Sequence, residues 1–495
     1  MTRFIGRTCS ALMIILLVNS CDDFLDEVPD NRVALDDLEK AAQLLTNGYS
    51  IASPAFTDWM TDNTAYTRGV SIRQVHERAF EWGEFVDDPN EPDSPSFFWY
   101  QAYNAIAHAN EVIAVLSNLP ADSEEQIALK RSIESEARLE RAYAHFMLVN
   151  LFAKHYNQNT AESDPGVPYV ETPETVFIKT YKRNTVKEVY DKVEADMLKG
   201  IELVDDSFFA NSGKYHFNRN AALAFATRFY LFKGDYDKVI ENANALLGSD
   251  PSAFVRDLTS EEFLGAGSSV LAYPQLYSSP EQRSNLLLMR KISLVQRTDF
   301  AHGPTDDVYD EIFGPNPFSG TDERENPSFV KGENGLFPAR YENLFERSSL
   351  NSNVGLPYHI GLMFRGEEVL LNRAEALAQK NRITEAIADI QTLANKRYSG
   401  TLNTITIDDL RNFYGVSGIG SISNRAVVLE YVVEERRREF LVQGMRWFDI
   451  KRFQIPVEHV LVDGTTIELE EDDLRKVLQI PTSAIDVGGL KPNPR

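Results

Sequence analysis

The clearest internal repeat of the chain is the stretch from Ala221 to Leu247, which reads AALAFATRFYLFKGDYDKVIENANALL. Its apolar residues recur at the three- and four-residue spacing of amphipathic helices, and Gly234-Asp235 interrupts them with a turn. Alanines on both sides of the turn allow two helices to approach closely, and Tyr230 and Tyr236 would fill the groove between them. The stretch therefore predicts a pair of antiparallel helices.

A weaker copy of this pattern runs from Glu367 to Tyr398, with a turn near Asn381-Arg382. Repeated helix–turn–helix units with small residues at the contact are typical of tetratricopeptide (TPR) folds. The helix expected over residues 137–156 could belong to another such pair. We therefore predict a mostly α fold in which TPR-like helix pairs form a scaffold.

Two further helices are predicted from apolar residues at helical spacing, over 35–49 and 97–116, and a third long helix over 124–155. Between Pro251 and Leu356 this periodicity fades, while glycine, proline and aromatic residues recur among polar ones. Long segments of this kind are usually functional when they are ordered, and the aromatic content argues against disorder. We expect an irregular, loop-rich ligand-binding region there. The predicted boundaries are 35–250 for the N-terminal region, 251–355 for the loop-rich region and 356–495 for the C-terminal region.

The first 34 residues have the pattern of an export signal followed by a tether. Arg3 and Arg7 precede an apolar run that is too short to span a bilayer and ends at Val18-Asn19-Ser20-Cys21. Small residues before a cysteine are typical of a bacterial lipobox, although an ordinary secretory signal with an incidental cysteine is the alternative. We expect residues 1–20 to be a signal peptide, Cys21 to carry a lipid anchor and residues 21–34 to form an acidic tether.

Composition excludes several classes of protein. The formal net charge is −24, so the chain lacks the basic surface that nucleic acid requires. Of its two cysteines, Cys9 lies in the expected signal peptide and Cys21 would be blocked by lipid, so no disulfide framework or zinc–thiolate site is expected.

Motifs that would indicate catalysis or a bound cofactor are missing from the sequence. It contains no HExxH, GxSxG, GxxxxGK[ST] or GxGxxG pattern, and its eight histidines form no pair at ligand spacing on one helix face. The acidic loop from Asp87 to Asp93 offers oxygen ligands but lacks the spacing and the glycine of an EF-hand. We expect a solvated loop there rather than a calcium site, and no enzyme activity, cofactor or metal.

Several stretches, taken together, resemble the SusD/RagB family of outer-membrane nutrient-uptake lipoproteins, and they cover nearly all of the mature chain. They are Cys21 to Asp26, Trp99 to Asn110, Glu136 to Tyr143, Gly166 to Val170, Arg219 to Leu247, Phe364 to Ala376, Glu435 to Phe440, Gly444 to Arg452, Ile480-Pro481 and Asn493-Pro494. Gln443 and Ala484 depart from the pattern, because glutamate is expected at both positions. The charged residues from Glu434 to Glu439 should form a surface and buried ion-pair network that fixes how the last helices dock, with Trp447 and Phe448 packed beneath.

The resemblance implies a lipid-anchored protein that faces the cell exterior. Such a protein would bind oligosaccharide and act as a lid over a SusC-like TonB-dependent β-barrel transporter. Peptide replaces glycan in some branches of the family, so a peptide-binding RagB-like protein is the main alternative. A periplasmic TPR-type assembly lipoprotein and a lipid-anchored glycoside hydrolase are two further alternatives.

No ligand residue can be carried over by motif, so the candidates rest on loop context and on the chemistry of sugars. Sugar C–H faces stack on aromatic rings, and hydroxyls need polar partners. The candidate ligand-binding residues are Trp59, Tyr66, Trp82, Tyr273, Tyr277, Phe337, Arg340 and Tyr341. We expect at least two of them to line the site, whereas Trp99 and Tyr103 should pack in the core.

Overall fold

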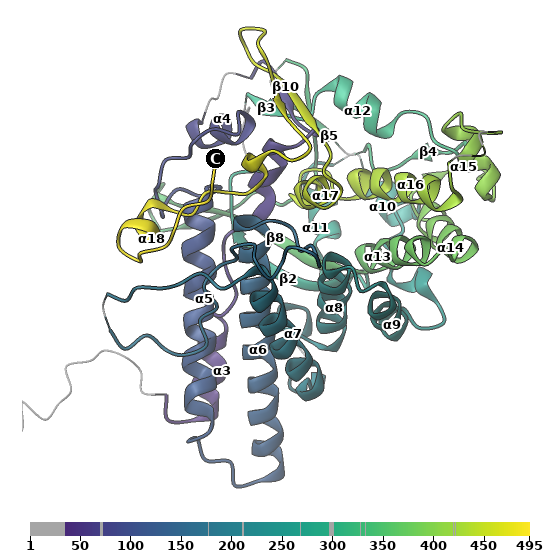
Figure 1. Ribbon diagram of the computed structural model, residues 1–495. Coiled ribbons are helices and arrows are strands. Elements are labelled where there is room, and N and C mark those ends of the chain that lie inside the picture. The colour runs from purple at the N-terminus through teal and green to yellow at the C-terminus, as the bar shows by residue number, and fades with distance from the viewer. Residues whose placement is uncertain are drawn as a thin grey trace, which may run out of the picture. The chain divides into compact units, whose positions relative to one another are not determined.

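The predicted helices are present in the computed structural model, which describes residues 35–69, 73–176, 178–209, 212–267, 269–296, 301–326, 328–331, 333–418, 420 and 422–495 (Figure 1). The expected signal peptide, Cys21 and the tether lie outside the described residues. Residues 37–495 form one compact unit.

Two long helices, α5 (Pro95–Leu116) and α6 (Glu124–Phe152), lie side by side, and α3 (Leu38–Leu45) packs against both (Figure 1). Local chemistry explains where they begin. Ser94 caps α5, with Pro95 in its first turn, and Ser123 and Gln126 form a reciprocal capping box at the start of α6. Trp99 is buried in α5, as predicted, and Tyr103 is half-buried beside it.

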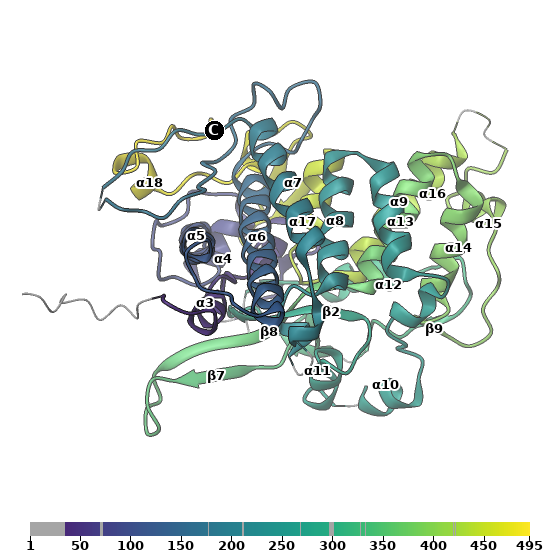
Figure 2. The same cartoon turned by 90° about the horizontal axis from the view of Figure 1, so that it is seen from below.

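Three helix pairs continue the scaffold. α6 packs on α7 (Val186–Leu203), α8 (Arg219–Lys233) on α9 (Tyr236–Leu247), and α13 (Gly366–Gln379) on α14 (Ile383–Ala394). Figure 2 shows α5, α6, α7, α8, α9, α13 and α14 following one another across the unit. The two repeats predicted around residues 221–247 and 367–398 are thus confirmed, and α6 does belong to a third pair.

The other helices are shorter, except for α16. They are α4 (Gln74–Phe80), α10 (Glu261–Ala266), α11 (Ala272–Tyr277), α12 (Asp306–Phe313), α15 (Ile407–Phe413), α16 (Asn424–Glu439), α17 (Met445–Phe453) and α18 (Thr482–Asp486). Short 3-10 helices include η1 (Pro54–Met60) and η3 (Gly213–Tyr215). Among the described residues, no helix combines the length and apolar composition needed to cross a membrane.

Strands occur where the sequence predicted only irregular loops. An antiparallel sheet has the order β2 (Asn285–Ile292), β8 (Gly355–Arg365), β7 (Leu344–Arg347), and the β7–β8 hairpin extends away from the helices in Figure 2. Paired short strands make up the rest: β1 (Ala65–Tyr66) with β3 (His302–Gly303), β4 (Thr321–Asp322) with β9 (Tyr398–Ser399), β5 (Ser328–Lys331) with β6 (Gly335–Pro338), and β10 (Val457–Val460) with β11 (Thr466–Leu469). The segment 251–355 is therefore more regular than expected.

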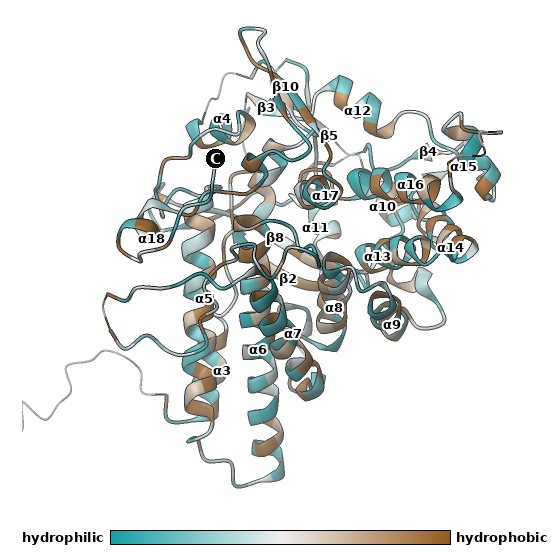
Figure 3. Ribbon diagram, in the orientation of Figure 1, coloured by the Kyte–Doolittle hydropathy of each residue, from teal (hydrophilic) through white to brown (hydrophobic). Residues whose placement is uncertain are grey.

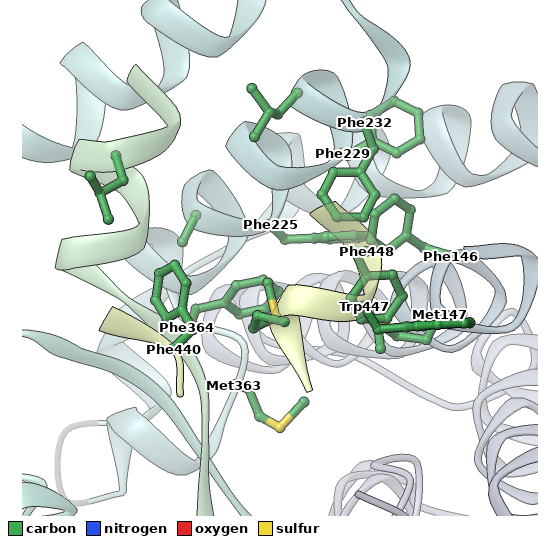
Figure 4. Close-up of a cluster of buried hydrophobic side chains, with 14 of the residues drawn as sticks. Phe146, Met147, Phe225, Phe229, Phe232, Met363, Phe364, Phe440, Trp447 and Phe448 are labelled. Atoms are coloured by element: carbon green, nitrogen blue, oxygen red, sulfur yellow. The ribbon is translucent and has the colours of Figure 1, made fainter. Parts of the chain in front are cut away.

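The main core lies between the helix pairs and α17. Figure 4 shows Phe146, Phe225, Phe229 and Phe232 together with Trp447 in one cluster, and all five side chains are buried. The rings of Phe225, Phe229 and Phe232 lie 5.4–6.0 Å from that of Phe146. Figure 3 shows α8 mostly brown, which agrees with burial of nearly every residue along it. Each of these aromatic side chains contributes roughly 1.5–3 kcal/mol by leaving water. The expected burial of Trp447 and Phe448 is confirmed.

A network of buried ion pairs joins the ends of α13, α14 and α16, as the sequence predicted for the last helices. Glu439 accepts two hydrogen bonds from Arg397 at 2.8 and 2.9 Å and a third from Arg324 at 3.4 Å. Arg324 also bonds Glu435 at 2.6 Å. Loss of one partner from such a network leaves a buried charge uncompensated. These contacts therefore fix how the helices dock against one another.

Candidate functional site

The eight candidate ligand-binding residues lie in separate parts of the unit, and most are inaccessible. The side chains of Trp59, Trp82, Tyr273, Tyr277, Phe337 and Arg340 are all buried, with exposed fractions of 3–6%. Only Tyr66 and Tyr341 are partly exposed. Tertiary packing therefore covers six of the eight candidates, namely five aromatic residues and Arg340, so loop context alone does not make a side chain accessible.

Tyr66 lies at the surface where β1 pairs with β3. Tyr66 is opposite His302 in the strand register, with ring centroids 6.0 Å apart. The amide of Thr67 donates to the carbonyl of Ala301 at 2.8 Å, and the amide of Glu333 donates to the carbonyl of Thr67 at 3.1 Å. Three segments far apart in sequence thus meet here, and we call Tyr66, Arg68, His302 and Glu333 the β1–β3 edge.

The β1–β3 edge combines a ring with charged hydrogen-bonding groups. The Arg68 guanidinium lies 3.6 Å from the Glu333 carboxylate, and the two side chains are exposed by 66% and 70%. Arg68 has a φ of 56°, in the left-handed region that non-glycine residues rarely adopt. Such strain costs about 1–3 kcal/mol and clusters at ligand sites. A ring beside an exposed arginine and glutamate could stack on a sugar and bond its hydroxyls.

Trp82 belongs to a buried column of rings beneath this edge, and Trp59 stacks on His76 with ring centroids 3.6 Å apart. Trp82 stacks on His459 at 4.4 Å, His459 on Phe80 at 4.1 Å, and Phe80 on His302 at 4.3 Å. Their indole groups are also engaged: Trp82 Nε1 donates to the carbonyl of Met60 at 2.9 Å, and Trp59 Nε1 to that of His302 at 3.3 Å. The column supports the β1–β3 edge from within.

Tyr273 and Tyr277 pack beneath α10, away from that edge. They stack at 5.8 Å with Phe263 beside them. The Tyr277 hydroxyl accepts a 2.8 Å hydrogen bond from Arg365, and the Arg256 guanidinium lies 3.8 Å from the ring centroid. These contacts are structural.

Phe337 lies in β6, and Arg340 and Tyr341 follow that strand. Arg340 donates to the carbonyl of Glu439 at 2.8 Å, and the Tyr341 ring lies 4.3 Å from His359. Burial raises the pKa of Tyr341. Phe337 lines a cavity of only about 10 Å³ with Trp59 and His302, which is far too small for a sugar.

The sequence predicts a solvated loop from Asp87 to Asp93, but the C-terminal end of this loop is covered. Asp93 is buried, and it accepts hydrogen bonds from the Ser293 hydroxyl at 2.6 Å and the Leu294 amide at 2.8 Å. Asp87 accepts from Ser96 and from the amide of Ser483. The described residues contain no group of three acidic, histidine or cysteine side chains placed to hold a metal ion.

One acid has a strongly shifted proton affinity. Burial raises the pKa of Asp58 to about 7, against the opposing effect of a hydrogen bond from Asn63. Shifts of this kind can mark catalytic acids. Asp58 lies inside the core, however, and its neighbour Asp62 is held by Arg446 at 2.7 Å. Asp58 is therefore covered, and Asp62 is engaged in an ion pair.

Sequence reasoning missed His302 and Glu333, which complete the β1–β3 edge. They lie more than 230 residues beyond Tyr66: the β1–β3 pairing places His302 beside it, and the amide of Glu333 bonds the carbonyl of Thr67. No local pattern in the sequence signals that contact.

Comparison with known proteins identifies the family. The family described as "Starch-binding associating with outer membrane", of SusD-like type, matches residues 23–231, and the SusD family matches residues 347–482. The chain belongs to the SusD/RagB family. The first matched segment contains the α6–α7 pair and most of α8, and the second contains the α13–α14 pair, whereas α9 and most of the loop-rich region lie between the two segments.

Known SusD-like proteins match this SusD/RagB family member over most of its length. SusD-like protein P38 of Formosa agariphila is 22% identical, and the alignment covers 92% of this chain and 93% of that protein. A SusD superfamily protein from Bacteroides thetaiotaomicron has a TM-score of 0.67 at 20% identity, over 93% of this chain and 100% of the other. A SusD-like carbohydrate binding protein from Bacteroides vulgatus has a TM-score of 0.58 at 15% identity, over 88% and 89%. These likenesses confirm the mostly α, SusD-like fold.

Proposed function

We propose that this protein binds oligosaccharide at the outer surface of the outer membrane and delivers it, without catalysis, to a SusC-like TonB-dependent transporter. The observation that carries the proposal is the family match over two long segments, one of which belongs to a family described as starch-binding and outer-membrane associated. A structural neighbour described as carbohydrate binding supports it. In this proposal acylated Cys21 holds the protein to the membrane.

We propose the β1–β3 edge as the contact surface for this ligand. Of the eight candidates, Tyr66 is the one whose ring reaches the surface beside exposed polar side chains. Its ring would stack on a sugar face, while Arg68 and Glu333 would bond hydroxyls. The buried tryptophans would act only by supporting His302 from beneath.

Calorimetric titration of the full chain in detergent with neutral oligosaccharides and with oligopeptides tests this proposal. We expect saccharide binding that Tyr66→Ala weakens about tenfold, because an aromatic stacking contact contributes roughly 1–1.5 kcal/mol. Tyr215→Ala removes a tyrosine that is 41% exposed in η3, outside the β1–β3 edge, and should leave the affinity unchanged.

Other outcomes would redirect the proposal. Binding of peptides alone would favour the RagB-like alternative, for which the exposed Arg68–Glu333 pair offers both charges. Release of reducing ends from the oligosaccharides would show catalysis. Purification from outer membranes that never yields a β-barrel partner would contradict the transporter role.

A further inference from the structure

A cavity of about 620 Å³ lies where the ends of α6, α8 and α17 meet the start of α9 and the segment 472–477. We call it the helix-end pocket. Its volume is in the range of small-molecule sites. None of the eight candidate residues lines it, and the β1–β3 edge takes no part in it.

Several polar groups that line the helix-end pocket lack a protein partner among the described residues. His155 makes no hydrogen bond through either ring nitrogen, and the hydroxyls of Tyr156 and Tyr236 are likewise unpaired. Arg452 has a side chain only 5% exposed, yet its Nε has no partner. Among the described residues that line the pocket, the Arg452 Nε is the one buried side-chain polar atom without a partner. His155, Tyr156 and Tyr236 are half-buried, so their polar atoms are available to a ligand rich in hydrogen-bonding groups.

The protonation state of His155 fits a neutral ligand. Burial, reinforced by Arg452 and Lys451, lowers its pKa to about 3. His155 is therefore neutral at physiological pH and offers one donor and one acceptor. Hydroxyl groups, which both donate and accept, complement such a ring.

Several charged groups around the helix-end pocket form ion pairs, and Lys451 donates to the carbonyls of Asn150 and Ala153. Arg452 bonds Glu375 at 2.7 and 3.0 Å, and also bonds Asp449 at 2.7 Å. Lys154 lies 3.7 Å from Asp164. An anionic ligand would have to compete with these carboxylates, whereas a neutral ligand leaves every pair intact.

Aromatic side chains supply apolar contact on the same walls. Tyr156, Tyr236 and Phe453 all line the pocket. The Arg452 guanidinium lies 4.7 Å from the Phe453 centroid and 5.2 Å from that of Phe232, which holds this wall rigid. Rings beside unpaired donors and acceptors are the combination that a sugar requires.

We infer that the helix-end pocket is a second binding site, for a neutral saccharide, separate from the β1–β3 edge. The inference takes its ligand class from the proposed function but does not depend on where that function places its site. Tyr236 and Tyr156 supply the stacking rings, and their hydroxyls together with His155 bond the ligand hydroxyls.

Calorimetric titration of the full chain with maltoheptaose, cellohexaose, xylohexaose and laminarihexaose, and with the anionic oligogalacturonate, tests this site. Tyr236→Phe keeps the ring and removes the hydroxyl, and His155→Leu removes both ring nitrogens. We expect each to weaken binding at one site about three- to tenfold, as loss of one or two hydrogen bonds predicts. Tyr215→Phe is the matched control and should change nothing. Thermal unfolding of each variant verifies that it is folded.

The outcomes separate the two proposals. Binding that Tyr66→Ala leaves in place, and that Tyr236→Phe or His155→Leu weakens, supports the helix-end pocket. Binding that is lost in Tyr66→Ala and unchanged in both pocket variants overturns the pocket and leaves the proposed function intact. Pocket-dependent binding of oligogalacturonate but of no neutral saccharide overturns the ligand class, and no pocket-dependent binding across the panel overturns the inference.

Discussion

The ammonium group of Lys291 lies in the interior of the protein. Among the described residues, no carboxylate lies at ion-pair distance from it. Its side chain is 3% exposed, and its Nζ donates to the carbonyl of Ser50. Burial lowers the pKa of Lys291 to about 7, against about 10.5 in the unfolded chain. Between these two values the unfolded state binds more protons, so this residue makes stability rise with pH over that range.

We expect Lys291→Met to raise the free energy of unfolding by about 2 kcal/mol at pH 6, because methionine removes the cost of a buried charge. The gain should shrink as the pH approaches 10, where the wild-type lysine is neutral in the folded state. Urea unfolding at several pH values measures this. Lys182→Met, at an exposed lysine, is the control, and a gain that does not vary with pH would contradict the argument.

At the scale of single elements, the turn between α8 and α9 depends on backbone geometry. Gly234 ends α8 with a φ of 80°, and a Cβ added there would meet no atom within 4 Å. The whole cost of a side chain would therefore come from the left-handed conformation.

We expect Gly234→Ala to lower the free energy of unfolding by about 1–2 kcal/mol, and Gly234→Asn to lower it less, because asparagine tolerates this conformation. Denaturant unfolding provides the measurement. Gly213→Ala is the matched control, since a Cβ there also meets open space but without a positive φ. Equal effects at the two positions would show that conformation is not the cause.

Helix pairs could be predicted because their signals are local. Apolar spacing, small residues and the Gly234-Asp235 turn all lie within one stretch of the chain. The sheet was missed for the opposite reason: β2 is a nearly continuous buried run without alternation, and its partner β8 begins more than 60 residues later. Such a run does not distinguish strand from buried helix by periodicity alone.

At the scale of the whole molecule, Glu439 links segments that are far apart in sequence. It bonds Arg397 and Arg324, and Arg365 lies 3.9 Å away. Burial alone would raise the pKa of Glu439, but Arg397 and Arg324 hold it well below its usual range. This contribution to stability is present above about pH 4.5 and is lost as the pH falls below that value.

We expect Glu439→Gln to destabilise the protein by about 3–5 kcal/mol at pH 7, because it leaves buried arginines uncompensated. The thermal midpoint should fall by several degrees, and the difference from wild type should narrow in acid. Glu430→Gln, at an exposed position on the same helix α16, should leave the midpoint unchanged. A similar fall in both variants would count against the network.

The candidate site could be predicted only in part, because its geometry depends on contacts between segments that are far apart in the sequence. Loop context selected Tyr66 correctly as a surface ring, but gave the same weight to Trp59 and Trp82, which the fold buries. Neither Glu333 nor the unpaired His155 carries a local signature. Which aromatic residue reaches the surface depends on contacts between distant segments.

Burial of the indole rings has a practical consequence for spectroscopy. All four tryptophans, Trp59, Trp82, Trp99 and Trp447, have exposed fractions of 6% or less. Their intrinsic fluorescence therefore reports whether the interior is intact, and quenchers dissolved in water should reach it poorly. Occupancy of a surface by ligand is better followed through signals from tyrosine and histidine.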